Sequence, residues 1–187
     1  MSQAQNPQTN SANESTRYSS ICSGTWGDAP AHDEVRLGRE ERAKEKSEPR
    51  DRLITLITDF GLQDGYVGAL KGVILTICPR ACVVDITHMI PPGDVRSAAY
   101  VLRSAYPHFP KGSIHLGVVD PGVGSSRKAV AIQAGTHTFV GPDNGLFSWV
   151  LHRESDWECR CLENEDIWGP EVSRTFHGRD IFGPVAA

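Results

Sequence analysis

An aspartate and an arginine bracket a glycine-rich turn near the middle of the chain. Asp120 directly follows the apolar run 114–119 and stands on a Pro-Gly turn, and Arg127 comes seven residues later. An apolar run that ends in a carboxylate is typical of a parallel strand, and open α/β folds hold their ligands at the carboxyl ends of such strands. The glycines at 122 and 124 let the backbone fold tightly or approach a ligand closely. The spacing predicts that acid and base face each other across one turn, with a solvated surface turn as the alternative.

Familiar nucleotide-binding motifs do not explain this stretch. Gly122-Val-Gly-Ser-Ser-Arg127 begins like a dinucleotide fingerprint, but Arg127 occupies the place of the third glycine that allows close helix packing. No phosphate-cradling loop ending in Gly-Lys-Ser or Gly-Lys-Thr occurs in the sequence. Asp59-Phe60-Gly61 resembles the magnesium-binding element of protein kinases, but the accompanying Gly-rich and catalytic loops are missing.

The composition narrows the class of protein. The 187 residues are 39% hydrophobic and carry a formal net charge of −4, with a sequence pI near 6.0. This balance lacks the basic footprint of a nucleic-acid-binding protein. No apolar run approaches the ~20 residues that span a bilayer, and the polar N-terminus does not resemble a secretion signal. The sequence therefore predicts a soluble, cytoplasmic protein with neither a nucleic-acid nor a membrane partner.

Five cysteines are scattered irregularly, at positions 22, 78, 82, 159 and 161. They lack the paired Cys-x-x-Cys or Cys/His spacing of a zinc site, so no metal site is predicted. The odd count favours buried or half-buried thiols in a reducing cytoplasm over disulfides.

The first 52 residues differ in composition from the rest. They are rich in Gln, Asn, Ser and Thr and then in mixed charges. A segment with so little to bury does not offset the entropy lost on ordering, so residues 1–52 are predicted to be a disordered tail. Hydrophobic patterning begins abruptly at Leu53, and residues 53–187 are predicted to form one α/β domain.

Apolar runs alternate with helical patterns at the start of this domain. The run 53–58 is apolar or β-branched throughout, as in a strand buried on both faces, and it ends in a second carboxylate, Asp59. Asp94 is a predicted helix N-cap. The predicted elements are strand 53–58, helix 66–77, strand 82–86, a helix from Val95 through Leu102, strand 114–119, an antiparallel pair of strands 129–133 and 138–140, a short helix or strand 146–151, and strand 157–162. Strand, helix, strand, helix, strand is the signature of a three-layer α/β fold with a mostly parallel sheet flanked by helices.

Five short motifs now occur in a recognisable order. They are Thr58-Asp-Phe-Gly61, Val84-Asp-Ile-Thr-His88, Val119-Asp-Pro-Gly-Val-Gly124 with Arg127, Pro142-Asp-Asn-Gly145 and Phe176-His-Gly-Arg-Asp-Ile-Phe182. Together they resemble the S-adenosyl-L-methionine (SAM) hydroxide adenosyltransferases, also called SAM hydrolases (adenosine-forming), which are relatives of the SAM-dependent fluorinase and chlorinase. The resemblance covers residues 53–187.

The resemblance implies cleavage of SAM by water to adenosine and methionine, with SAM as substrate and no cofactor. The Asp-Arg-His triad of the family falls on Asp120, Arg127 and His177. Because the sulfonium of SAM is already a good leaving group, the task is to aim a nucleophilic oxygen at the ribose C5′. Three roles remain open: Asp120 accepting a water proton, Arg127 steadying a hydroxide, and His177 orienting the pair or sharing the proton.

Three further residues match substrate positions of the family. Asp59 matches the ligand of the ribose diol, since a carboxylate accepts hydrogen bonds from two hydroxyls at once. Phe176 is expected to pack on the substrate and Asn144 to line the pocket, with purely structural roles in the core and the turn as the alternative for both.

The resemblance also implies a second domain and an assembly. Family members continue into a smaller C-terminal β-barrel, and the SAM site forms between the first domain of one subunit and the barrel of its neighbour in a trimer. This chain ends where the barrel would begin, so we expect the N-terminal domain only, and a homotrimer for a full-length form. The halogenase branch replaces the Asp and His that stand here as Asp120 and His177, so water is the expected nucleophile. A SAM-dependent halogenase, a non-catalytic SAM- or adenosine-binding module and an inactive truncated fragment are the alternatives.

Overall fold

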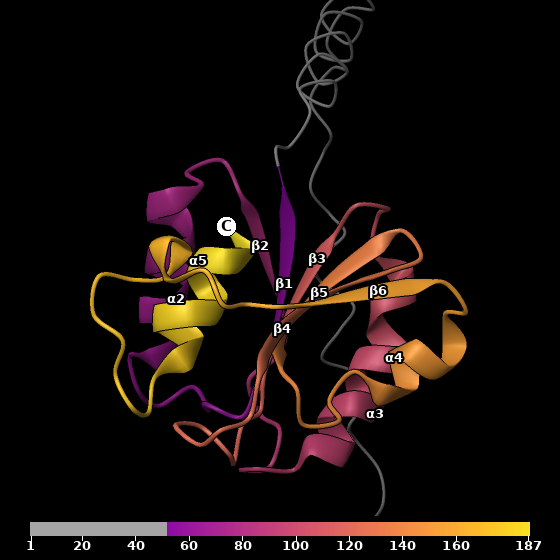
Figure 1. Ribbon diagram of the computed structural model, residues 1–187, viewed down its shortest axis with the longest axis horizontal. Coiled ribbons are helices and arrows are strands. Elements are labelled where there is room, and N and C mark those ends of the chain that lie inside the picture. The colour runs from indigo at the N-terminus through magenta and orange to yellow at the C-terminus, as the bar shows by residue number, and fades with distance from the viewer. Residues whose placement is uncertain (1–51) are drawn as a thin grey trace, which may run out of the picture. The chain divides into compact units, whose positions relative to one another are not determined.

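The apolar run at the start of the domain forms a central strand of a six-stranded sheet in the computed structural model, which describes residues 52–187 (Figure 1). The elements are β1 (Leu53–Thr58), α2 (Tyr66–Ile77), β2 (Cys82–Thr87), α3 (Val95–Ala105), a 3₁₀ turn (Tyr106–His108), β3 (Ile114–Val118), β4 (Ala129–Ala134), β5 (His137–Pro142), α4 (Ser148–Arg153), β6 (Trp157–Cys161), a second 3₁₀ turn (Glu165–Ile167), a π-helix (Gly178–Phe182) and α5 (Gly183–Ala186). The predicted tail 1–52 lies outside the described residues except for Arg52, whose Nη1 donates to the backbone oxygen of Ala187 at 2.9 Å.

The strands follow the order β2-β1-β3-β5-β4-β6. β1 pairs in parallel with both β2 and β3, and β3 pairs in parallel with β5. β4 runs antiparallel to its neighbours β5 and β6, so it alone is reversed among the strands described. The predicted mostly parallel sheet with an antiparallel 129–140 hairpin is therefore confirmed.

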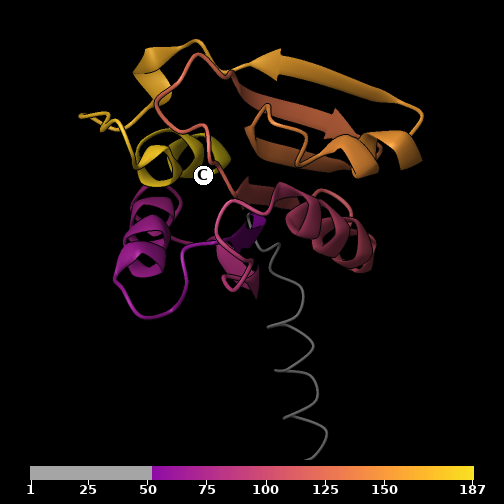
Figure 2. The same ribbon diagram turned by 90° about the horizontal axis from the view of Figure 1, so that it is seen from below.

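Helices cover both faces of the sheet, as Figures 1 and 2 show. On one face Ile54 and Leu56 of β1 pack in a cluster with Leu70 of α2 and with the C-terminal residues of the chain. On the other face Ile57 packs in a cluster with Leu102 of α3 and with α4. β1 is buried on both faces because its residues alternate between two packed layers, which explains why its sequence is apolar or β-branched throughout. The three-layer prediction is confirmed.

The two long helices begin and end as their sequences indicate. α2 has the predicted bounds, and it buries Val67, Leu70 and Ile74 along one side. α3 begins after Asp94, whose carboxylate accepts a hydrogen bond from the backbone N–H of Ser97 at 3.0 Å, so the predicted N-cap is confirmed. The ambiguous stretch after residue 145 is a helix, Ser148–Arg153.

Two features near the C-terminus differ from expectation. Residues 178–186 form a π-helix followed by a short α-helix, which no sequence pattern predicted. The thiols of Cys159 and Cys161 are exposed rather than buried, because they lie on β6, a strand at the edge of the sheet whose five residues are all exposed.

Candidate active site

Arg127 links Asp120 to His177 at the carboxyl edge of the sheet. Its Nε and Nη2 donate to Asp120 Oδ2 at 2.9 and 2.6 Å. The same Nη2 lies 2.7 Å from Nδ1 of His177. The structure thus brings together three residues that are separated by up to 57 positions in the sequence. The predicted face-to-face arrangement of Asp120 and Arg127 is confirmed, and the alternative of a solvated arginine is wrong, since the Arg127 side chain is 11% exposed.

The loop between Asp120 and Arg127 is built from two successive turns. The backbone N–H of Val123 donates to the oxygen of Asp120, and that of Ser125 donates to the oxygen of Gly122, both at 3.1 Å. Gly124 has φ of +76°, and a Cβ at this position would lie 2.6 Å from the backbone oxygen of Arg174. The loop therefore needs glycine here for two reasons, backbone conformation and space.

His177 is positioned by the turn into the π-helix. The backbone N–H of Phe176 donates to Ser173 Oγ at 2.9 Å, and Asp180 Oδ2 accepts from the backbone N–H of Ser173 at 2.8 Å. Asp180 is also bonded by Arg179, whose Nε lies 2.6 Å from its Oδ1. These contacts fold the 173–180 segment back on itself and fix the ring of His177 beside Arg127.

The environment of His177 favours its neutral form. Burial makes the largest contribution to lowering the pKa of His177, and the adjacent Arg127 cation lowers this pKa further. Asp120 and Asp180 oppose both effects. Because a guanidinium N–H only donates, Nδ1 of His177 is the acceptor in this contact, and the neutral ring carries its proton on Nε2. A neutral imidazole is what the Arg127 contact requires.

A cavity of about 160 Å³ opens beside this cluster. Its lining includes Asp59, Asp120, Thr175, Phe176 and His177. Oδ1 of Asp120 is buried and has no hydrogen-bond partner among the described residues. A buried carboxylate oxygen without a donor is costly, and Asp120 is one of the residues that line the cavity, so its carboxylate is a candidate acceptor for a hydrogen-bonding ligand or water.

Asp59 reaches the same cavity from the carboxyl end of β1. Its Oδ2 accepts a hydrogen bond from the backbone N–H of Gly93 at 2.8 Å, which fixes the carboxylate. The residue before it, Thr58, contacts His88 Nδ1 at 2.8 Å and accepts from the backbone N–H of Phe60 at 3.2 Å. The end of the strand is thereby anchored on both sides of Asp59.

Phe176 lies in an aromatic group at the rim of the cavity. Its ring centroid is 5.7 Å from that of Phe60 and 4.8 Å from that of Tyr66. The guanidinium of Arg179 lies over the Phe176 ring, 5.0 Å from its centroid. Sequence reasoning missed Phe60, which lines the cavity, although its position directly after Asp59 was an available signal.

Asn144 does not line this cavity. Its Nδ2 donates to the backbone oxygen of Val119 at 2.9 Å, and its Oδ1 accepts from the backbone N–H of Leu146 at 3.2 Å. Both ends of the amide are thus engaged in holding the turn after β5 against the end of β3. Asn144 is bonded to the residue before Asp120 and is not among the residues that line the cavity, which favours the structural alternative for this residue.

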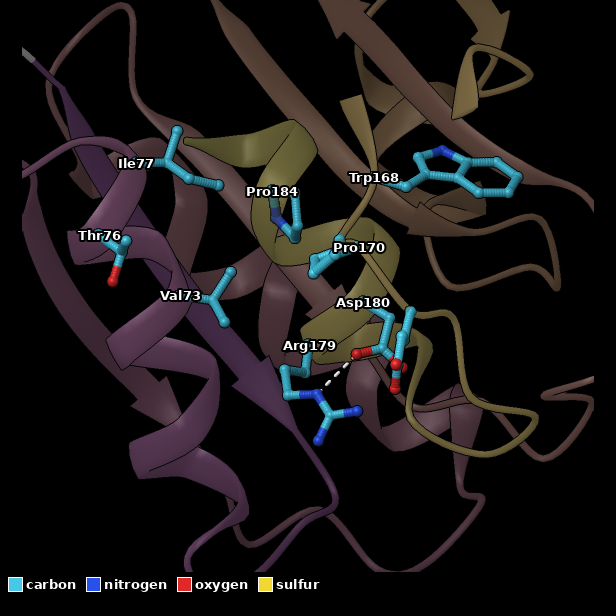
Figure 3. A pocket seen from close by; sticks show the side chains of 10 residues that line it. Val73, Thr76, Ile77, Trp168, Pro170, Arg179, Asp180 and Pro184 are labelled. Carbon is cyan, nitrogen blue, oxygen red and sulfur yellow. Dashed lines mark hydrogen bonds and ion pairs between the residues drawn. The ribbon is translucent and has the colours of Figure 1, made fainter. Parts of the chain in front are cut away.

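Two other hollows lie outside this cavity. A space of about 680 Å³ separates α2 from the 168–171 segment, and Val73, Ile77, Trp168 and Pro184 line it (Figure 3). A smaller hollow of about 260 Å³ lies beside Arg127 and His177 and also touches Trp168. The largest of these three hollows contains none of the six predicted site residues, so volume alone does not identify the site.

Within residues 52–187, no group of three or more His, Cys, Asp or Glu side chains is arranged to hold a metal ion. None of the helices in this part is long and apolar enough to cross a bilayer.

The similarity to known proteins covers the α/β domain. The sequence model of the SAM hydroxide adenosyltransferase N-terminal domain matches residues 54–187. The chain is 50% identical over 135 residues to a curated (R)-S-adenosyl-L-methionine hydrolase of Salinispora tropica, covering 72% of this chain and 51% of that protein. A fluorinase of Actinoplanes is more distant, at 24% identity over 152 residues, 69% of this chain and 51% of that protein.

A solved structure shares the fold. A crystal structure of an uncharacterised conserved protein from Thermotoga maritima superposes with a TM-score of 0.69 at 45% identity, covering 72% of this chain and 52% of that one. The chain thus spans about half the length of the relatives that it matches.

Proposed function

The chain belongs to the SAM hydroxide adenosyltransferase family, and from that premise we propose that it provides the N-terminal half of an enzyme that hydrolyses SAM to adenosine and L-methionine. Water attacks the ribose C5′, a C–O bond forms, and the C5′–S bond breaks. The electron pair of that bond goes to the sulfonium sulfur, which leaves as the neutral thioether of methionine. No acid, metal or cofactor is required, since the leaving group departs without a proton.

The observation that carries this proposal is the unpaired Oδ1 of Asp120. A water molecule in the cavity would donate one proton to this oxygen, which orients the water lone pair and accepts the proton as the C–O bond forms. The proton then passes to solvent. Of the three roles left open by the sequence, the geometry thus favours Asp120 as the group that holds the water.

Arg127 and His177 act through Asp120 in this scheme. Arg127 fixes Oδ2 of Asp120 with two N–H groups, and its Nη2 also contacts Nδ1 of His177, so the guanidinium that holds the carboxylate is itself held by His177. Fixing a nucleophile within reach of its target contributes several kcal/mol when the geometry is close to attack. Both residues are therefore positioning residues for the water held by Asp120.

The binding residues follow from the same cavity. Asp59, anchored by Gly93, has its other oxygen available for a ribose hydroxyl, and Phe176 supplies an apolar wall. We retain Asn144 only as a support for the Asp120 backbone. The described cavity of about 160 Å³ is smaller than the roughly 300–1,000 Å³ typical of ligand pockets, so further walls have to come from elsewhere in the protein. We propose that they come from a C-terminal domain in a cytoplasmic homotrimer, as the family resemblance implies.

Product analysis tests the proposal. The chain, alone and joined to the C-terminal half of the Salinispora relative, is incubated with SAM, and adenosine and methionine are quantified by chromatography. We expect both products in equal amounts from the joined form. Absence of adenosine above the enzyme-free rate, with the relative itself active in parallel, would reject the hydrolase assignment.

Halide addition distinguishes the rival chemistry. A halogenase would release 5′-halo-5′-deoxyadenosine when chloride or fluoride is supplied, whereas a hydrolase yields adenosine regardless of halide. Tight SAM binding by calorimetry without either product, unchanged by Asp120→Ala, would instead indicate a non-catalytic binding module.

A further inference from the structure

The edge strand β6 presents a hydrogen-bonding edge that has no partner in the described part of the chain. β6 pairs with β4 alone and is the outermost strand of the sheet (Figure 2). The backbone N–H of Leu162 donates to Ala129, and the oxygen of Asp156 accepts from Gly135, so the even-numbered residues direct their backbone groups toward β4. Since these groups alternate along a strand, Trp157, Cys159 and Cys161 direct theirs outward. An open edge of this kind is a template for another strand.

The side chains of β6 are exposed on both faces of the sheet. Trp157, Cys159 and Cys161 lie on one face, because they are paired with Ala134, Ile132 and Val130 of β4. Glu158 and Arg160 lie on the other face, where Arg160 Nη2 is 3.0 Å from Glu158 Oε1. Trp157 is 50% exposed. The strand therefore carries one apolar face, one face with a charge of each sign, and a free backbone edge.

Glu158 and Arg160 flank Cys159, so two antiparallel β6 strands centred on Cys159 would pair opposite charges. Two β6 strands can pair antiparallel about a two-fold axis perpendicular to the sheet. Residues that lie directly opposite each other then share one face of the sheet, so one residue of β6 must lie on the axis, opposite the same residue of the second copy. An axis at Glu158 or Arg160 places two like charges directly opposite each other, which is destabilising. An axis at Cys159 places Glu158 opposite Arg160 of the second copy, twice, and Trp157 opposite Cys161 of the second copy.

We propose that β6 is a homodimerisation edge, through which two copies of this chain join their sheets antiparallel with Cys159 on the two-fold axis. In this register the outward backbone groups of Trp157, Cys159 and Cys161 face the same groups of the second copy and exchange hydrogen bonds. The aromatic ring of Trp157 packs against the sulfur of Cys161 across the interface, a favourable contact for a polarisable sulfur. This assembly is independent of the reaction proposed above.

Charge reversal tests the register. Sedimentation of the full chain over a range of concentrations is expected to show a dimer. Arg160→Glu places two glutamates opposite each other twice and is expected to give a monomer, whereas Glu158→Arg combined with Arg160→Glu restores the pairing and the dimer. A monomer at every concentration, or a dimer indifferent to Arg160→Glu, would overturn the proposal. Thermal melting of each variant separates loss of dimer from loss of fold.

Cysteine oxidation tests the axis independently. Two Cα atoms in a directly hydrogen-bonded antiparallel pair lie about 5.5 Å apart, within the range of a disulfide. Diamide takes up the two protons and two electrons that two Cys159 thiols release, so a dimer linked through Cys159 is expected on non-reducing electrophoresis. Cys161→Ser should keep this species and Cys159→Ser should abolish it. A cross-link that depends on Cys161 instead would contradict the proposed register.

Discussion

Arg127 binds Asp120 through one carboxylate oxygen only. Nε and Nη2 both donate to Oδ2, at 2.9 and 2.6 Å, instead of taking one oxygen each in the parallel pairing that arginine and carboxylate often adopt. Oδ1 is left buried with no donor among the described residues, and Asp120 is one of the residues that line the cavity. The ion pair thus fixes the carboxylate while keeping one acceptor available, which is the arrangement that a water-holding group requires.

Asp120→Asn tests this acceptor. The amide has nearly the same shape but cannot take a proton from water, so hydrolysis of SAM by the joined form is expected to fall about 10²- to 10⁴-fold. The measurement is kcat from adenosine release under saturating SAM. Because Asp120 is 4% exposed and paired with Arg127, thermal melting is measured in parallel to show that the variant is folded.

A matched control separates this effect from a general loss of negative charge. Asp156→Asn makes the same chemical change at an exposed position after α4, outside the cavity lining, and should leave kcat within twofold. Equal loss of activity in the two variants, or full activity in Asp120→Asn, would contradict the assignment of the water to Asp120.

The lowered pKa of His177 leads to a prediction for how activity falls at acid pH. Burial and the neighbouring Arg127 lower its pKa, so the neutral ring persists below the ordinary histidine range near 6.5. Below that lowered pKa the ring gains a proton on Nδ1, ceases to accept from Arg127 and places a second cation beside it. Activity is therefore expected to be retained through pH 6.5 and to fall only at lower pH.

His177→Asn identifies the titrating group. Asparagine offers an oxygen near the position of Nδ1 and keeps an acceptor for Arg127, but it does not titrate. The variant is expected to retain part of kcat/KM while losing the acid-side inflection that His177 causes. An unchanged inflection in His177→Asn would assign it to another group.

Gly124→Ala tests the loop that brings Arg127 back to Asp120. The substitution is strained by the φ of +76° and by a Cβ 2.6 Å from the Arg174 backbone oxygen. We expect a loss of about 1–3 kcal/mol in the free energy of unfolding, measured by urea denaturation, together with reduced activity as Arg127 shifts. Gly112→Ala is the matched control, since φ is +81° there but no atom lies within 4 Å of the added Cβ. It should cost less and leave activity unchanged.

The sequence predicted the elements that have strong local patterns. β1 and α2 have the predicted bounds because a continuous apolar and β-branched run and a one-sided helical stripe each suit one structure only. Asp59 and Asp120 meet at one edge because β1 and β3 are parallel neighbours, so two carboxylates at strand ends necessarily lie close together.

Features that depend on the order of the strands in the sheet could not be predicted from the sequence. The engagement of both ends of the Asn144 amide depends on how the turn after β5 meets β3, and the exposure of Cys159 depends on β6 being at an edge. Neither fact leaves a local pattern. The contact between His115 and His137 was missed for the same reason, since it exists only because β3 and β5 are neighbours.

These two histidines predict how stability depends on pH. His115 is fully buried, with Nδ1 2.7 Å from Thr55 Oγ1 and Nε2 3.1 Å from His137 Nδ1. Burial, with a smaller contribution from His137, lowers the pKa of His115 to about 3. The unfolded chain binds this proton near pH 6.5 and the folded chain only near pH 3, so this stabilisation is complete above pH 6.5 and is lost as the pH falls toward 3. The slope from this group is at most about 1.4 kcal/mol per pH unit.

His115→Asn is expected to flatten that dependence. Asparagine retains a partner for Thr55 but has no proton to gain, so the free energy of unfolding should fall less between pH 6.5 and 4 than in the wild type, even if the variant is less stable at pH 7. Urea denaturation at several pH values provides the measurement. His152→Asn, at an exposed position on α4, should preserve the wild-type slope. A slope unchanged by His115→Asn would show that other groups, not the buried histidine, bind the proton on unfolding.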